Sequence, residues 1–199
     1  MIVSGKELSA QLKEEMKAQV ATFPEKYGRV PHLVVILVGE DPGSVSYVTG
    51  KAKASEVVGI KNTTIRRPDT ISEAELLDMI AELNADDSVD GILVQLPLPK
   101  QISEQKVIEH IVQSKDVDCF HPYSAGKLFT GAPVFEPCTP SGIMELIYES
   151  GIEISGSEWV VVGRSNIVGK PMAMLLLAAN GTVTVAHSKT PDLKEVCKR

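Results

Sequence analysis

The sequence predicts an α/β protein built on parallel sheets, and three observations support that prediction. Residues 32–39 and 90–96 are short apolar runs rich in β-branched residues, which is typical of strands buried on both faces. Stretches with apolar residues at helical spacing lie between the strand candidates. Strand and helix therefore alternate along the chain, and this order predicts a three-layer α/β domain followed by a second strand–helix–strand unit.

The N-terminal half begins with one helix and continues as a βαβαβ pattern. Ser4 and Glu7 form a capping-box pattern ahead of an apolar stripe, which predicts the first helix. After the strand at 32–39 we expect a helix from about residue 44 to residue 58. Gly59 would end it in a left-handed conformation, which glycine adopts at little cost. The alternating stretch "KNTTIRR" then predicts a strand.

The middle of the chain contains another helix and strand before the regular pattern is lost. Ser72 and Glu75 repeat the capping box ahead of a helix that precedes the strand at 90–96. A short helix is expected at about 103–112. The stretch 113–139 has turn residues, scattered aromatic residues and little periodicity, so we expect an irregular, site-forming loop there.

The last third predicts the beginning of a second βαβ unit. Thr139 as N-cap and Pro140 as first residue predict a helix that ends near residue 150. The stretches "EWVVVG" and "TVTVAH" are strand candidates on either side of a helix from about Gly169 to Ala179. A further helix is expected to start in "TPDLKEVCKR".

We place a domain boundary at residue 139. Residues 1–139 would form the first α/β domain, and residues 140–199 would form the N-terminal part of a Rossmann-like dinucleotide-binding domain. Such a domain ordinarily has two mononucleotide-binding halves. Because only two strands fit before residue 199, we expect this chain to lack the C-terminal part of the second domain.

The composition argues against several classes of protein. The 199 residues are 43% apolar and 23% charged, and the formal charge of −6 gives no basic surface for nucleic acid. No apolar run approaches the roughly 18–20 residues that span a bilayer, and the N-terminus does not resemble a secretory signal, so we expect a cytoplasmic protein. The wide spacing of Cys119, Cys138 and Cys197 fits reduced thiols better than a disulfide framework or a zinc site.

The stretch "VVVGRSNIVGKP" at 160–171 is typical of a strand that enters a glycine turn and then a helix, where phosphates are often bound. It is not a P-loop, because Gly163 and Gly169 are one residue too far apart and Pro171 stands where Ser or Thr is required. The dinucleotide fingerprint G-x-G-x-x-G fits the context better, although Ser165 replaces its second glycine and Gly169 falls one residue late. Neither motif is complete, so the spacing alone leaves open what this turn binds.

Tyr47 and Lys51 are four residues apart on a predicted helix, so they share one of its faces. Two interpretations stay open. An exposed lysine whose stem covers a tyrosine is the common arrangement. Alternatively, a lysine that is partly shielded from water exchanges protons with a ligand in a pocket.

Gln95 interrupts the end of an otherwise apolar strand, at the carboxyl end where ligands of open α/β sheets bind. A purely structural hydrogen bond is the alternative. The prolines that follow predict a rigid loop that can hold a cis peptide bond. Asp116 and Asp118, in "KDVDCFHP", have the character of turn formers with side chains in water.

His121 and His187 each lack a second ligand at metal-binding spacing. We therefore expect structural or substrate-edge roles for both histidines, and no metal.

The chain resembles the bifunctional methylenetetrahydrofolate dehydrogenase/methenyltetrahydrofolate cyclohydrolase family over essentially its whole length. The resemblance rests on six ordered stretches: "VGEDPGSVSYVTGKAKA", "DGILVQLPLP", "KDVDCFHP", "PCTPSGI", "VVVGRSNIVGKPMAMLL" and "TVTVAHSKT". It implies oxidation of 5,10-methylenetetrahydrofolate with NADP⁺ and hydrolysis of the methenyl product to 10-formyltetrahydrofolate. Both steps would share one pocket and belong to one-carbon metabolism and purine biosynthesis, and the family also implies a homodimer.

The resemblance implies a role for each residue of the folate pocket. Tyr47 would stack on the folate ring system, and Lys51 would be the general acid/base. Gln95 would hold and tune that lysine, and Asp118 would anchor the polar edge of the pterin. The wall of the pocket would be shaped by Leu96, Pro97 and Pro99.

The resemblance also explains the glycine turn. Gly163 would let the backbone approach the dinucleotide, and Gly169 would start the next helix near the phosphates. Arg164 and Ser165 would face the adenosine ribose, and a guanidinium there suits a 2′-phosphate, which favours NADP over NAD. Ser188 would be a further phosphate contact, whereas pairing of Arg164 with a nearby acid is the alternative for that residue.

Cys119 departs from the family pattern, because it replaces a glycine. If the position needs a positive φ, the cysteine costs roughly 1 kcal/mol or more, and this strain can displace the Asp118 anchor. The missing C-terminal part leaves a second hypothesis, a folate-binding fragment without dehydrogenase activity. A third, a two-domain NADP dehydrogenase of the amino-acid or shikimate type, does not account for "SYVTGK" together with "VQLPLP".

Overall fold

The computed structural model describes residues 2–199, which form two compact units. One unit is Ser9–Val117, and the other joins Asp118–Arg199 to the N-terminal residues up to Leu8. In chain order the elements are α1 (Gly5–Val20), α2 (Phe23–Tyr27), β1 (His32–Val38), α3 (Pro42–Val58), β2 (Lys61–Arg67), α4 (Glu73–Ala85), β3 (Gly91–Val94), α5 (Glu104–His110), η1 (Gln113–Lys115), α6 (Pro122–Phe129), α7 (Cys138–Glu149), β4 (Glu158–Val162), α8 (Gly169–Ala178), β5 (Thr182–Ala186) and α9 (Leu193–Val196).

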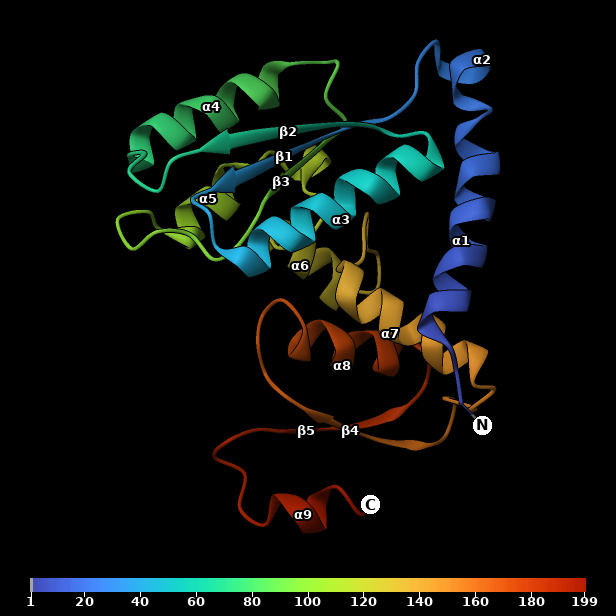
Figure 1. Ribbon diagram of the computed structural model, residues 1–199. Coiled ribbons are helices and arrows are strands. Elements are labelled where there is room, and N and C mark those ends of the chain that lie inside the picture. Colours follow the sequence, from blue (N-terminus) through green and yellow to red (C-terminus); the bar gives the residue numbers. More distant parts are fainter. Residues whose placement is uncertain (1) are drawn as a thin grey trace. The chain divides into compact units, whose positions relative to one another are not determined.

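The unit Ser9–Val117 is built on a parallel three-stranded sheet in the order β2-β1-β3. Helices α3 and α4 lie on opposite sides of this sheet (Figure 1). Along β1, Val34, Ile36 and Val38 pack into a cluster with residues of α4 and α5, while Val35 and Leu37 pack against α3. The central strand is therefore buried on both faces, which confirms the predicted three-layer arrangement.

Local capping signals set the starts of the helices α1, α3 and α4. Ser4 accepts the Glu7 N–H at 3.3 Å, and Ser72 with Glu75 forms a complete capping box. Helix α3 begins two residues earlier than expected because the Asp41 side chain caps it. Its carboxylate accepts the Ser44 N–H at 2.8 Å and the Ser44 hydroxyl at 3.0 Å, and these bonds hold the pKa of Asp41 below its usual range.

Gly59 ends α3 in the left-handed conformation, with φ 83°, as predicted. The strand predicted at 90–96 is shorter than expected, because β3 ends at Val94. Gln95 is therefore the first residue after the strand. Helix α2 was not predicted from the sequence.

At the amino edge of the same sheet, where the strands begin, polar side chains form a hydrogen-bonded network. Asp90 accepts two hydrogen bonds from the Arg29 guanidinium and one from the His32 N–H at 2.8 Å. The buried His32 ring contacts the Ser88 carbonyl oxygen at 3.1 Å and the Thr63 hydroxyl at 2.8 Å. The Arg29 guanidinium holds the pKa of the Asp90 carboxyl below its usual range.

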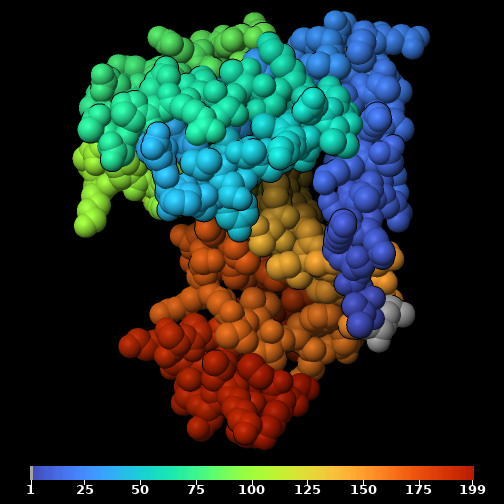
Figure 2. Space-filling model, viewed as in Figure 1, coloured from blue at the N-terminus to red at the C-terminus, as the bar shows by residue number. Residues whose placement is uncertain are grey.

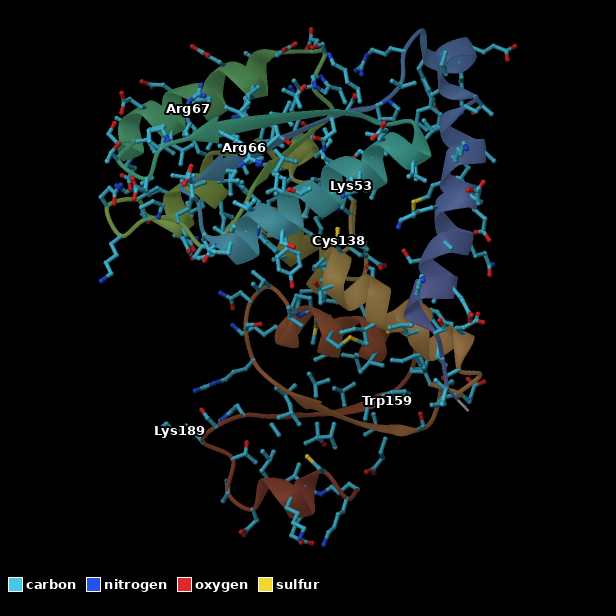
Figure 3. The ribbon with its side chains drawn as sticks, viewed as in Figure 1. Lys53, Arg66, Arg67, Cys138, Trp159 and Lys189 are labelled. Atoms are coloured by element: carbon cyan, nitrogen blue, oxygen red, sulfur yellow. The ribbon has the colours of Figure 1, made fainter. Side chains whose placement is uncertain are left out.

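The second unit contains a parallel pair of strands, β4 and β5, and the helices α6, α7, α8 and α9. Met144, Met172, Leu175 and Leu176 are buried in its core, and Trp159 of β4 packs against them (Figure 3). The strand–helix–strand order β4-α8-β5 confirms the predicted second βαβ unit.

Two predictions in this unit were wrong. The stretch 113–139 is not irregular throughout, since α6 occupies Pro122–Phe129 and is capped by the His121 ring, whose Nδ1 accepts the Tyr123 N–H at 3.0 Å. Eight residues give too little periodicity to reveal such a helix. Helix α7 begins at Cys138 with Pro137 at its N-cap, so Thr139 is inside the helix and does not cap it. Among residues 2–199, no helix is long and apolar enough to cross a membrane.

Candidate functional site

The carboxyl ends of the three strands β1, β2 and β3 meet at one edge of their sheet. The segments that follow the strands are tied to each other by backbone hydrogen bonds. The Gly39 N–H donates to the Arg67 carbonyl oxygen at 2.9 Å, and the Gln95 N–H donates to the Ile36 carbonyl oxygen at 2.9 Å. Loops at this edge of open α/β sheets are where ligands usually bind.

Lys51 and Gln95 are hydrogen-bonded to each other at this edge. The Lys51 Nζ donates to Gln95 Oε1 at 3.0 Å, and both side chains are partly buried. The Gln95 Nε2 donates to the Leu96 carbonyl oxygen at 2.8 Å, which leaves the amide oxygen for the lysine. The Lys51 amine is therefore hydrogen-bonded to Gln95 in a partly buried position, an arrangement closer to the second of the two interpretations than to an exposed lysine.

Tyr47 lies one helical turn before Lys51 on α3, and its side chain is 70% exposed. Residues of helix α3 (light blue to cyan) lie at the surface in the view of Figure 2. A large aromatic side chain at this exposure leaves a ring face uncovered. Tyr47 and Lys51 thus combine a stacking surface with a positioned amine on one helix.

The loop after Gln95 contains a cis peptide bond between Leu96 and Pro97, as the sequence suggested. Leu96 and Pro99 are partly buried, whereas Pro97 is exposed. The Leu98 N–H donates to Glu104 Oε1 at 3.3 Å, which holds the loop against the start of α5. The three predicted wall residues therefore lie in one tethered loop directly after Gln95.

Asp116 and Asp118 differ in their surroundings. Asp116 is only 3% exposed and forms an isolated parallel bridge with Ile92, so the prediction of a side chain in water was wrong for it. Asp118 is partly buried and belongs to the second compact unit. Cys119 has φ 58° and is 2% exposed. Cys119 therefore adopts a positive φ, the condition under which a cysteine costs roughly 1 kcal/mol or more relative to glycine.

The glycine turn between β4 and α8 needs both of its glycines. Gly163 has φ 154° and donates its N–H to the Ala186 carbonyl oxygen at 2.8 Å. A Cβ atom at Gly169 would lie 2.4 Å from the Gly163 carbonyl oxygen, closer than any carbon can approach. The start of α8 is thus packed directly on the backbone of the turn.

Ser165 caps α8 from within the turn. Its hydroxyl oxygen accepts the Val168 and Gly169 N–H groups at 3.1 and 3.2 Å, and its carbonyl oxygen accepts the Lys170 N–H at 3.0 Å. The first N–H groups of the helix are therefore already bonded within the chain. Arg164 and Ser165 are both exposed.

Ser188 is exposed in the loop after β5, next to Lys189, which is labelled in Figure 3. This loop is ordered by His187. The His187 N–H donates to the Thr190 hydroxyl at 2.9 Å, and its Nδ1 accepts the Lys189 N–H at 3.1 Å. His187 and His121 thus both make local structural hydrogen bonds. Within residues 2–199, no three His, Cys, Asp or Glu side chains are grouped to hold a metal ion.

Two polar residues near Lys51 escaped the sequence analysis. The buried Ser55 donates its hydroxyl to the Lys51 carbonyl oxygen at 2.9 Å, and Asn62 Nδ2 donates to Ser55 Oγ at 3.3 Å. Single polar residues in a helix and in an alternating strand carry no signal that they will meet. Only the pairing of α3 with β2 brings them together.

The fold and the site define an α/β protein with a βαβ nucleotide-binding unit and a lysine–glutamine pair at a sheet edge. Models of the tetrahydrofolate dehydrogenase/cyclohydrolase family match residues 3–118, as its catalytic domain, and residues 137–199, as its NAD(P)-binding domain. The chain therefore belongs to the tetrahydrofolate dehydrogenase/cyclohydrolase family.

Individual relatives are similar over the whole chain. A bifunctional protein FolD from Acetivibrio thermocellus is 58% identical over 100% of this chain and 69% of its own length. The crystal structure of the dehydrogenase-cyclohydrolase of Trypanosoma brucei, complexed with NADP cofactor and inhibitor, has a TM-score of 0.93. Its sequence is 35% identical to this one, and the match covers 100% of this chain and 67% of the Trypanosoma brucei chain. The NAD-dependent 5,10-methylenetetrahydrofolate dehydrogenase of Saccharomyces cerevisiae has a TM-score of 0.80, with 25% identity over 92% of this chain and 62% of that one.

Proposed function

We propose that this chain oxidises 5,10-methylenetetrahydrofolate with NADP⁺ and hydrolyses the methenyl product to 10-formyltetrahydrofolate. The observation that carries the proposal is the Lys51–Gln95 hydrogen bond beside the exposed Tyr47, in a member of this family. These residues combine an aromatic surface for a flat heteroaromatic ring with an amine whose position is fixed.

Lys51 acts as the general acid/base of the hydrolysis. The attack of water on the methenyl carbon releases a proton, and opening of the ring requires one at nitrogen, so an amine held near the reacting carbon serves both needs. Gln95 Oε1 keeps the Lys51 amine in place, while Tyr47 stacks on the folate ring system. Asp118 anchors the polar edge of the pterin, and the pocket wall is formed by Leu96, Pro97 and Pro99.

The residues of the glycine turn fit a dinucleotide, which accepts the hydride when it is bound. Gly169 lets the start of α8 pack on the backbone of the turn, and the space beside Gly163 is open, so a phosphate group can approach the backbone there. Because Ser165 already bonds the first N–H groups of α8, the phosphates are bound by the turn itself more than by the helix end. Exposed Arg164 and Ser188 bind the 2′-phosphate, which selects NADP over NAD.

Further parts of the proposal rest on the family resemblance. Residues 1–139 are the folate-binding catalytic domain and residues 140–199 belong to the cofactor domain, in keeping with the family models that match 3–118 and 137–199. The protein acts as a homodimer in the cytoplasm and serves purine biosynthesis. The widely spaced cysteines, typical of a reducing compartment, support that location.

The experiment that tests this function measures three quantities on the chain. They are formation of NADPH or NADH from 5,10-methylenetetrahydrofolate, decay of the methenyl cation, and binding of tetrahydrofolate. We expect turnover with NADP⁺ well above that with NAD⁺. An Arg164→Ala variant is expected to raise the KM for NADP⁺ about tenfold or more and to leave the KM for NAD⁺ within twofold, because a charge-assisted bond to the 2′-phosphate is lost.

Two outcomes would contradict the proposal. Equal use of NADP⁺ and NAD⁺ would remove the role of Arg164, a result in keeping with the NAD-dependent relative from yeast. Binding of tetrahydrofolate without either reaction would make the chain a folate-binding protein and not an enzyme.

A further inference from the structure

A chain of hydrogen bonds connects the backbone of Lys51 to the edge strand β2. Thr64 donates its hydroxyl to Asn62 Oδ1 at 3.2 Å, Asn62 Nδ2 donates to Ser55 Oγ at 3.3 Å, and Ser55 donates to the Lys51 carbonyl oxygen at 2.9 Å. The last bond ends on the backbone of the proposed acid/base residue. The Lys51 residue is therefore bonded at two points, its amine to Gln95 and its carbonyl oxygen to Ser55.

We infer that Ser55 and Asn62 are positioning residues, which fix the rotation of α3 about its own axis and so direct the Lys51 amine toward Gln95 and the folate. This inference rests on the proposed role of Lys51. A helix that packs on a sheet through apolar contacts alone can rotate slightly at little cost. The directional hydrogen bond from Asn62 of β2 to Ser55 of α3 restricts that freedom.

Burial makes the Ser55 hydroxyl rely on hydrogen bonds within the protein. Ser55 is 7% exposed, so its hydroxyl has little access to water and depends on its two protein partners. The orientation of the Asn62 amide is fixed as well, because its oxygen accepts from Thr64 while its nitrogen donates to Ser55. The strand and the helix are thus joined by a chain in which each donor has one acceptor.

Helix α3 is anchored at its ends by other means. The Asp41 carboxylate caps its N-terminus, and Gly59 ends it in the left-handed conformation. Lys51 lies between these two anchors along α3. The bonds through Ser55 act at this point, four residues after Lys51.

Thr49 provides a matched control on the same helix. Its hydroxyl donates to the Val45 carbonyl oxygen at 2.7 Å, the same bond to the residue four positions earlier that Ser55 makes to Lys51. Thr49 is exposed, and its hydroxyl bond stays within the helix. A Thr49→Ala variant therefore removes an equivalent local bond while leaving the bonds between α3 and β2 unchanged.

The test compares the cyclohydrolase activities of the Ser55→Ala, Asn62→Ala and Thr49→Ala variants. We expect the first two to lower kcat roughly tenfold with KM within twofold, because a misplaced amine affects the reaction more than folate binding. Thr49→Ala is expected to stay within twofold in both. Ser55→Thr keeps a hydroxyl that can make the same bond, so it is expected to restore kcat to within about threefold of the original.

A second measurement separates positioning from stability. In a Lys51→Met background, Ser55→Ala is expected to have no further effect on the residual rate, because Ser55 acts through Lys51. The rate at which acetic anhydride modifies Lys51, relative to Lys53 in the same protein, is expected to change at least twofold in Ser55→Ala. Lys53 is exposed on the outer side of α3 and serves as an internal reference (Figure 3).

The results that overturn the inference are distinct from those that overturn the proposed function. If Ser55→Ala and Thr49→Ala lower the melting temperature alike and leave kcat and Lys51 labelling unchanged, Ser55 is merely structural. Equal losses of kcat in Ser55→Ala with and without Lys51 also overturn it. If Lys51→Met alone keeps full activity, the proposed acid/base role fails, whatever Ser55 does.

Discussion

The two edges of the sheet in the unit Ser9–Val117 differ in how far their polar groups are hydrogen-bonded within the chain. At the amino edge, Asp90 is satisfied by three hydrogen bonds from Arg29 and His32, and Lys115 donates to three carbonyl oxygens at the end of α4. At the carboxyl edge, the Lys51 amine donates to one acceptor among residues 2–199, Gln95, and Tyr47 is largely exposed.

The contrast predicts that stability and activity depend on different edges of the sheet. At the amino edge, the polar groups form their hydrogen bonds with other groups of the chain. The carboxyl edge places donors and acceptors that have remaining capacity for a ligand, since an ammonium group can donate three hydrogen bonds. Removing a group from the amino edge should therefore change stability, and removing one from the carboxyl edge should change activity.

The largest expected effect is that of Lys51→Met on the carboxyl edge. We expect the cyclohydrolase rate to fall at least about 100-fold, because general acid/base catalysis contributes roughly 10²–10⁴-fold. The melting temperature should stay close to the original, since an unbranched side chain of similar length replaces the lysine. The matched control is Lys53→Met, two residues further along the exposed side of α3, which should keep its activity. Equal losses in both variants would remove the distinction between the two lysines.

Gly91→Ala should have the next largest effect, and on stability. Gly91 begins β3 at the amino edge, where an added Cβ atom would lie 2.5 Å from Val117 Cγ1, so the strand or Val117 must move. We expect a loss of about 1–3 kcal/mol in the free energy of unfolding, measured with urea. Gly50→Ala is the control, since nothing lies within 4 Å of its added Cβ atom and alanine favours a helix by about 1 kcal/mol. A Gly91→Ala protein as stable as the original would contradict the tight packing of this edge.

Asp90→Asn should have the smallest effect, and one that depends on pH. Because the folded-state pKa of Asp90 is lowered, chiefly by the hydrogen bonds from Arg29, its ionised form stabilises the fold above the unfolded pKa of about 3.9. That contribution is lost as the pH falls through the lower, folded pKa. The pair is over 40% exposed, so we expect about 1 kcal/mol at neutral pH.

Urea unfolding of both proteins from pH 7 to pH 2 measures this difference. The gap between the original chain and Asp90→Asn should be full at neutral pH and narrow below about pH 4. The cyclohydrolase rate at neutral pH should stay within twofold. A gap that is independent of pH would show that the carboxylate charge of Asp90 does not contribute.

The elements with strong local signals could be predicted from the sequence, and the exceptions have physical reasons. Ser72 with Glu75 and the apolar run of β1 gave correct predictions because capping boxes and buried strands are encoded by neighbouring residues. Helix α6 was missed because eight residues are too few for periodicity, and Thr139 was misassigned because Pro137 takes the N-cap.

In the candidate site, too, some features could be predicted from the sequence and others could not. Tyr47 and Lys51 share a helix face through their spacing alone, so their proximity was predictable. Ser55 and Asn62 lie on different elements and meet only when α3 packs on β2, so no local pattern indicates their bond. Asp116 looked like a turn residue, yet its backbone pairs with Ile92 and buries it.

The position of β2 at the end of the sheet order has a consequence for the behaviour of the protein in concentrated solution. An outer strand presents unpaired backbone groups, along which a second molecule can add its own strand and start aggregation. Strand β2 carries Lys61, Arg66 and Arg67, all exposed, so two such strands brought side by side would repel each other. The cations at the two ends of β2 therefore protect the molecule against strand-to-strand aggregation, although none of them takes part in the proposed chemistry.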